Sequence, residues 1–167
     1  MKLNSNKCVF GVTAGKFLGF MESYRGIEVN PEKIQAIMEL ALPKIVKEVQ
    51  SLNGKITALN KFVSRATDKC LPFFCILKRL FEWTDKCQRA FENLKLYLSF
   101  PPLLSPSKPR GKLYLYLAVS HAAVSTALIR KKDGLQRPVY FTSRAFRGAE
   151  ERYPQIEKLA FALVTAA

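Results

Sequence analysis

Residues 113–129 read LYLYLAVSHAAVSTALI, and this stretch determines how the second half of the chain folds. Leucines recur at every second position at its start, and a period of two is typical of a β-strand. The apolar pattern breaks after residue 119 and resumes over 123–131, which predicts a β-hairpin. A turn at 131–134 then leads to a third expected strand over 137–142.

The first thirty residues predict a small β-structure of their own. Residues 7–30 alternate in a β-like way, which indicates two or three short antiparallel strands. Cys8, Phe10 and Val12 would share one face, and a turn at 25–26 would separate two of the strands.

Helices are expected between these two β-regions. Asn30 suits an N-cap and Pro31 the first turn of a helix that Pro43 ends. A second helix over 46–66 carries apolar residues at steps of three and four. A short apolar helix or turn follows, and then a helix that Thr84 caps. The apolar stripe of the second helix comprises Val49, Leu52, Ile56, Leu59 and Phe62 or Val63.

The stretch SPSKPRG at 105–111 is the clearest linker and marks the predicted domain boundary. The chain therefore divides into 1–30, 31–105 and 106–167, with a last helix that starts near Glu150. Strands followed by helices and then by strands predict an α+β fold.

The composition favours a polyanionic partner. The 167 residues carry 27 Lys and Arg against 13 Asp and Glu, a net charge of +14. Such an excess is typical of proteins that bind nucleic acid or an anionic membrane surface. A basic surface kept only for solubility is the alternative. The 49% of hydrophobic residues argues against disorder.

The cysteines and the chain ends bear on the cellular setting. The four cysteines form no Cys-x-x-Cys pair and the single His121 is far from them, which favours reduced intracellular thiols over zinc binding. Neither a secretory signal nor a run of eighteen apolar residues occurs, so we expect an intracellular protein, in cytoplasm or nucleus. The abrupt start and the stop inside a helical pattern lead us to expect a fragment of a polyprotein or a truncated reading frame.

A series of short segments resembles the pol region of gypsy-type LTR retrotransposons along the whole chain. Each segment alone is weak, but their order and spacing together are specific. They are KCVF at 7–10, KFLGF at 16–20, NPEKIQAI at 30–37, VKEVQSLNG at 46–54, NKFV at 60–63, FEWT at 81–84, AFENLK at 90–95, PPLLSP at 101–106 and RPVYFTSR at 137–144.

The resemblance implies a role for each part of the chain. Residues 1–30 would be a primer-grip-like hairpin at the end of the palm, and 31–105 the thumb and connection. Residues 106–167 would be the first half of an RNase H-like domain, a partial mixed β-sheet with one helix. The polymerase Asp-Asp motif would lie upstream, and the sequence has no Asp-Asp pair. The remaining pol domains are then expected partners.

Two positions depart from the family pattern. The family places metal-binding carboxylates where this chain has Ala118 and Leu159. A shift of two residues in the helix would make Glu157 a ligand instead. A two-metal nuclease needs several converging oxygen ligands, so we predict no catalytic site and no cofactor in this chain. Mg²⁺ is expected only for the full-length enzyme. The acids of 106–167 are Asp133, Glu150, Glu151 and Glu157, of which Glu150 and Glu151 equally suit a helix start.

The same resemblance implies contacts to nucleic acid, either an RNA–DNA hybrid or duplex DNA, independent of sequence. Lysines off the apolar stripe would contact phosphates, although a solvated helix face gives the same pattern. Gly54 would allow close approach of a nucleic-acid backbone, or is simply tolerated in the helix. The predicted binding residues are Phe17, Gly19, Phe20, Lys47, Gly54, Lys55, Lys61 and Arg65.

These observations favour a reverse-transcriptase fragment that binds template–primer and has no cutting site of its own. A catalytically dead spacer or an untranslated genomic relic remains open, as does part of an active RNA-directed DNA polymerase and ribonuclease H in a full polyprotein. A membrane partner is not expected. In isolation, residues 31–100 should be the most stable part, because a lone hairpin and an incomplete sheet are marginal in water.

Overall fold

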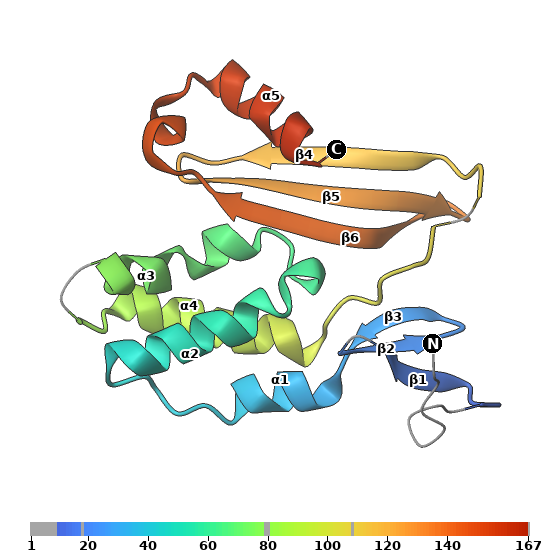
Figure 1. Ribbon diagram of the computed structural model, residues 1–167, viewed down its shortest axis with the longest axis horizontal. Helices are drawn as coiled ribbons and strands as arrows, with labels where there is room; N and C mark the ends of the chain where they lie inside the picture. The colour runs from blue at the N-terminus through green and yellow to red at the C-terminus, as the bar shows by residue number, and fades with distance from the viewer. Residues whose placement is uncertain (1–9, 18, 79–80, 108, 167) are drawn as a thin grey trace, which may run out of the picture.

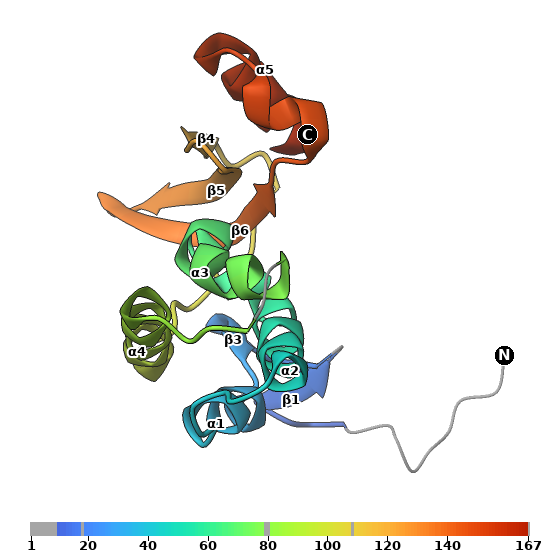
Figure 2. The ribbon, with the colours of Figure 1, turned by 90° about the vertical axis from the view of Figure 1, so that its left-hand side faces the viewer.

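The computed structural model describes residues 10–17, 19–78, 81–107 and 109–166. Two small antiparallel sheets accompany a layer of helices, one lying beside the helices and the other above them (Figure 1). The view turned by 90° separates α5 (Gln155–Ala166), the second sheet and the helical layer along the vertical direction (Figure 2). The fold is therefore α+β, as the sequence predicts. No helix among the described residues is long and apolar enough to cross a membrane.

The N-terminal sheet has three strands in the order β1-β2-β3, which confirms the larger of the two expected numbers. The strands are β1 (Ala14–Phe17), β2 (Phe20–Ser23) and β3 (Gly26–Val29). The expected face of Cys8, Phe10 and Val12 is not part of the sheet, because β1 begins only at Ala14. Phe10 and Val12 are exposed in the segment before β1, and Cys8 lies outside the described residues.

A glycine ties this sheet to a distant segment. Gly26 has φ +144°, and a Cβ there would collide with the carbonyl oxygen of Leu104. The close approach lets Ile27 and Leu104 exchange two backbone hydrogen bonds of 2.9 and 3.0 Å. Glycine is required here because other residues carry a Cβ and avoid positive φ.

The first helix confirms its predicted start. In α1 (Pro31–Met38) the Asn30 side chain accepts a hydrogen bond from the Glu32 N–H, and Pro31 occupies the first turn. The helix ends at Met38, before Pro43 could stop it.

The expected single helix over 46–66 is wrong. The chain instead forms α2 (Val46–Thr57), a 3₁₀ turn η2 (Asn60–Phe62) and then α3 (Ala66–Lys78), and Arg65 has φ +52°. The break is stabilised from outside the segment, because the Tyr97 hydroxyl donates to the Phe62 carbonyl at 2.9 Å and accepts from the Ser64 N–H at 3.3 Å. The predicted apolar residues are nevertheless buried, since both Phe62 and Val63 lie in the core.

Helix α4 (Asp85–Ser99) buries the predicted face and completes the main core. Thr84 takes the cap position with extended backbone, although its hydroxyl contacts the Cys87 sulfur rather than a backbone N–H. The buried residues of this helix are Cys87, Phe91, Leu94 and Leu98. They join the buried residues of α2 and α3 in one hydrophobic cluster.

The second sheet has the order β4-β5-β6, and all its described pairs are antiparallel rather than mixed. Its strands are β4 (Leu113–Val119), β5 (Ala123–Lys132) and β6 (Leu135–Ala145). Asp133 and Gly134 both have positive φ, as a two-residue hairpin turn requires. Pro138 is accommodated because β6 is an edge strand and the ladder shifts register at Leu128/Ile129.

The last helix begins later than expected. Glu150 lies in a 3₁₀ turn, η3 (Gly148–Arg152), and α5 (Gln155–Ala166) starts after Pro154. Proline disfavours helical backbone at the preceding residue, so the chain leaves the helical conformation at Tyr153. Glu150 is used locally, since its carboxylate accepts from the Arg147 N–H and pairs with Arg144 at 2.9 Å.

The two halves are joined by polar contacts. The Thr67 N–H donates to Ser143 Oγ at 3.1 Å, and Ser120 Oγ donates to Asp68 Oδ1 at 2.7 Å. Ser105 opens the predicted linker, yet it is buried and its N–H donates to the Pro138 carbonyl at 2.7 Å. Helix α3 is therefore held against one face of the second sheet, and α5 covers the other face (Figure 2).

Candidate nucleic-acid interface

Helix α2 presents an exposed ridge of small residues. Lys47 and Gly54 are seven positions apart, which places them on the same side of an α-helix. Ser51 and Ala58 fall on the same line, and all four residues are exposed. A Cβ built at Gly54 meets nothing within 4 Å, so the described packing does not require glycine there. Lys47, Ser51, Gly54 and Ala58 are called the α2 ridge below.

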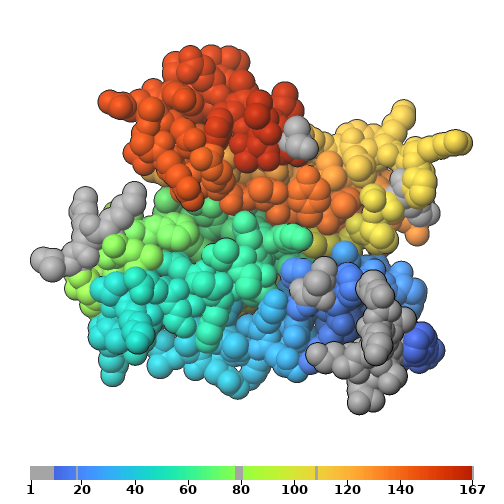
Figure 3. All heavy atoms as spheres, viewed as in Figure 1, coloured from blue at the N-terminus to red at the C-terminus, as the bar shows by residue number. Residues whose placement is uncertain are grey.

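The α2 ridge is open to solvent on one face of the molecule. In the space-filling view α2 occupies the centre and left of that face, where no other segment covers it (Figure 3). The sequence prediction named Lys47 and Gly54 but missed Ser51 and Ala58. A helical projection from Lys47 would have found them, because steps of three and four keep returning to one side.

Two of the other three predicted cations are engaged within the chain. Lys55 is half-buried and its Nζ donates to the Ala36 carbonyl at 3.0 Å, which links α2 to α1. Arg65 pairs with Asp68 at 3.0 Å in the bend before α3. Lys61 is exposed, and its Nζ lies 5.6 Å from the centre of the Phe20 ring. Lys47 and Lys61 thus remain the more available of the four.

The predicted hairpin residues have different environments. Phe17 is 61% exposed at the end of β1. Gly19 has φ +80° and forms the turn into β2, a conformation that favours glycine. Phe20 is half-buried and packs on Phe62 with ring centres 5.5 Å apart, so much of its ring serves the core. Of the two predicted phenylalanines, Phe17 is the one that a ligand could reach more fully.

Ala118 and Leu159 lie on neighbouring elements, β4 and α5. Leu117 and Val119 pack into the small cluster that includes Phe161 of α5. Successive side chains of a strand alternate between faces, so Ala118 projects from the face that α5 does not cover. Ala118 is exposed and pairs across the ladder with Ser125.

The residues at these positions do not fit a pair of Mg²⁺ ions. Alanine and leucine supply no oxygen ligand, and Mg²⁺ is bound through carboxylate oxygens. Glu157 is exposed in the first turn of α5, and Glu150 is occupied by Arg144 and the Arg147 N–H. The hydrogen bond and charge of Arg144 lower the pKa of Glu150. Among the described residues, no group of three His, Cys, Asp or Glu could hold a metal ion.

Comparison with known proteins identifies the family. Residues 83–167 match the model of the RNase H-like domain found in reverse transcriptase. The chain belongs to this family. The matched region starts two residues before α4, so it includes a helix of the main core as well as the second sheet.

Curated relatives extend the likeness to the whole chain. The Transposon Tf2-3 and Tf2-4 polyproteins of Schizosaccharomyces pombe are each 28% identical to it over 165 residues, which is 97% of this chain. The chain spans 12% of the length of these relatives. The predicted resemblance to retrotransposon polyproteins is thereby confirmed.

Solved structures show the same fold. The foamy viral protease-reverse transcriptase in complex with dsDNA superimposes with a TM-score of 0.76 at 22% identity, covering 93% of this chain and 33% of the viral one. The same viral protein in complex with an RNA/DNA hybrid gives a TM-score of 0.75 at 22% identity, over 92% of this chain and 21% of the other.

Proposed function

We propose that this chain binds template–primer nucleic acid without sequence preference and has no cutting site of its own. The observation that carries the proposal is the α2 ridge, an exposed line of small side chains that begins with a lysine. Small residues let a sugar–phosphate backbone approach the helix, and a lysine can neutralise a phosphate. Foamy viral proteins of the same fold are in complex with dsDNA and with an RNA/DNA hybrid, which supports this choice of ligand.

The proposed contacts extend from the α2 ridge towards the N-terminal sheet. Lys61 is exposed beyond the end of α2, and Phe17 is exposed on β1. Phosphate contacts from such lysines give affinity that falls steeply with salt but does not read sequence. An RNA–DNA hybrid and duplex DNA should accordingly bind with similar affinity.

The absence of cutting follows from Ala118 and Leu159. Without carboxylates at these two positions the chain has no means of holding two metal ions against a scissile phosphate. Mg²⁺ chemistry would belong to other parts of a full polyprotein, as would polymerisation.

The test is a titration of a labelled RNA–DNA hybrid with the purified chain over a salt series with Mg²⁺ present. We expect binding with a log–log salt slope of several units and an intact hybrid. The double variant K47Q/K61Q should lower the slope by roughly 2, since each phosphate contact contributes about 0.9. K44Q/K86Q removes the same charge at exposed positions elsewhere and is the matched control. A folded chain that binds nothing, or a hybrid that is cut, would contradict the proposal.

A structural spacer is a second candidate that the contacts between the halves favour. Asp68 and Thr67 of α3 hydrogen-bond to the second sheet, and α3 itself packs into the main core. The RNase H-like half would then hold the thumb-like helices at a fixed distance from whatever follows. This role is compatible with nucleic-acid binding.

A further inference from the structure

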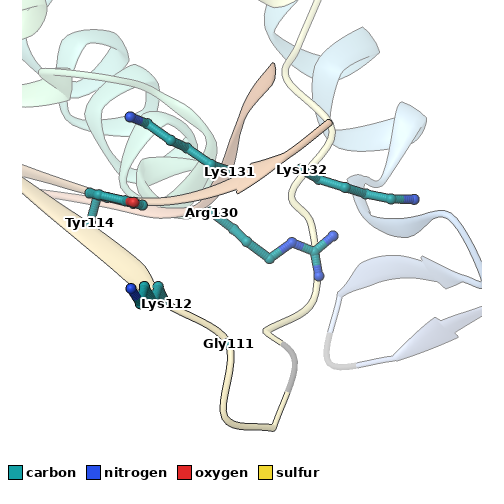
Figure 4. Close-up of a pocket in the computed structure, with 6 residues that line it drawn as sticks. All are labelled: Gly111, Lys112, Tyr114, Arg130, Lys131 and Lys132. Carbon is teal, nitrogen blue, oxygen red and sulfur yellow. The ribbon is translucent and has the colours of Figure 1, made fainter. Parts of the chain in front are cut away.

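Cations gather at the end of the second sheet where β5 and β6 join. Lys112 precedes β4, and three consecutive cations end β5. With Gly111 and Tyr114 they line a cleft of about 350 Å³ (Figure 4). Lys112, Tyr114, Arg130, Lys131 and Lys132 are called the basic end below.

The sequence around the basic end contains few acids. Asp133 is the only acid of the sequence between residues 106 and 149, and it lies exposed in the β5–β6 turn. The ion pairs found in the described part of the chain all lie elsewhere. Arg130 even faces Arg137 across the ladder, and like charges in that position are unfavourable. The fold therefore holds these cations together against their mutual repulsion.

Two of the cations are held in place by neighbouring groups. Arg130 is half-buried, and its Nη1 donates to the Pro106 carbonyl at 2.7 Å. Its Nε is buried and has no hydrogen-bond partner among the described residues. Lys131 Nζ lies 4.6 Å from the centre of the Tyr114 ring, a cation–π contact that orients the lysine. Such preorganisation lowers the entropy lost when a ligand binds.

The directions of the side chains define the kind of anion. Alternation along β5 places Arg130 and Lys132 on one side of the strand and Lys131 on the other. Figure 4 shows Lys131 and Lys132 extending in opposite directions from the strand end. Charges that diverge in this way cannot converge on one small anion. They can, however, contact several phosphates of an extended polyanion that passes the end of the sheet.

We infer that the basic end is a second contact surface for a nucleic-acid phosphate backbone, separate from the α2 ridge. The inference rests on the proposed function and adds a site in the RNase H-like half. The basic end lies at the same end of the molecule as the N-terminal sheet (Figure 1). One nucleic acid bound near Phe17 and Lys61 could therefore extend past it.

The experiment uses the full chain and fluorescent duplex DNA in a salt series. The triple variant K112Q/K131Q/K132Q should reduce the log–log salt slope by about 2.7, since three contacts contribute about 0.9 each. Its loss of affinity between 50 and 200 mM salt should then be about 40-fold smaller than that of the unmodified chain. K44Q/K86Q/R89Q removes three exposed charges from other segments and should change the slope by less than 1. K131R/K132R keeps the charge and should bind as the unmodified chain does.

Each outcome separates the two ideas. If both triple variants behave alike while K47Q/K61Q weakens binding, the basic end is not a contact surface and the α2 proposal stands. If the unmodified chain does not bind duplex, both fail. Tight binding of anionic phosphatidylserine vesicles that the basic-end variant alone loses, with duplex binding unchanged, would assign the surface to membranes and overturn the inference. Inorganic phosphate at millimolar concentration should not compete, and strong competition would contradict the divergent geometry.

Discussion

Replacing Gly54 by alanine should stabilise the free chain and weaken its binding to nucleic acid. Gly54 lies inside α2, and a Cβ there meets nothing within 4 Å, so the methyl group fits without strain. Glycine in a helix interior costs about 1 kcal/mol relative to alanine. The free energy of unfolding of G54A should therefore rise by up to about 1 kcal/mol.

Binding should change in the opposite direction. If a sugar–phosphate backbone lies against the α2 ridge, the methyl group occupies space that the ligand uses. An overpacked contact costs about 1–3 kcal/mol, which corresponds to a weakening of roughly 5- to 150-fold. If the nucleic acid instead contacts another part of the molecule, G54A should bind it with unchanged affinity. The two measurements together thus distinguish a binding surface from a tolerated glycine.

Urea unfolding followed by circular dichroism gives the stability, and fluorescence anisotropy with a labelled RNA–DNA hybrid gives the affinity. N93A is the matched control, because Asn93 is exposed on α4 and alanine also favours a helix there. It should gain a few tenths of a kcal/mol without any change in affinity. A stabilised G54A that binds as tightly as the unmodified chain would refute the role of the α2 ridge.

Three other perturbations test the structure. S120A removes the 2.7 Å hydrogen bond to Asp68 and should lower the free energy of unfolding in urea by about 1.5–3 kcal/mol; an unchanged midpoint would exclude this link between the halves. The hydrogen bond and charge of Arg144 lower the pKa of Glu150 in the folded state. The pair therefore stabilises the fold above the ordinary pKa of a glutamate, and this stabilisation is lost as the pH falls through the lowered pKa. E150Q should flatten the stability profile in this acidic range, and an identical acid limb would contradict the pairing. Burial raises the pKa of the Cys70 thiol to about 12. Iodoacetamide at pH 8 should therefore label exposed Cys75 well before Cys70, as read from a peptide map. Equal labelling rates for the two cysteines would show that the core around Cys70 opens readily.

The regular elements could be predicted because their signals are local. Asn30 and Pro31 specify the start of α1 within two residues, and Asp133-Gly134 specifies a hairpin turn. The spacing of apolar residues identified the buried faces of α2 and α4 for the same reason, because this spacing can be read within each segment alone.

The break after α2 could not be predicted because it depends on a distant side chain. The hydroxyl of Tyr97 satisfies backbone groups of Phe62 and Ser64 that a continuous helix would have paired internally. Local periodicity continues through the break, so the sequence favours one helix while the tertiary contact favours two. The late start of α5 could have been predicted, because Pro154 is a local signal for a helix boundary.

Some features of the candidate sites likewise follow from local sequence, whereas others depend on how distant elements pack. The exposure of Gly54 and Lys47 follows from the helical period, whereas the engagement of Lys55 by the Ala36 carbonyl depends on how α1 packs. At the basic end, Lys131 and Lys132 are visible as a charged pair in the sequence. That Arg130 lies beside the start of β4 follows only from the register, which pairs it with Leu113.

If the chain binds nucleic acid without cutting it, as we propose, Ala118, Leu159 and the cations of 106–167 all affect the affinity for a phosphate backbone. An acid near a phosphate backbone repels it unless a metal ion lies between them, so under the proposed function the chain would bind nucleic acid better without carboxylates at positions 118 and 159. Residues 106–167 contain 11 Lys and Arg but only 4 Asp and Glu, and the resulting net charge of +7 is half of the +14 of the chain. Ala118 is exposed and so contributes little to packing, which explains how the sheet keeps its fold without the acid. Under the proposed function, these residues favour holding a nucleic acid over cutting it, and they require no change in the architecture of the second sheet.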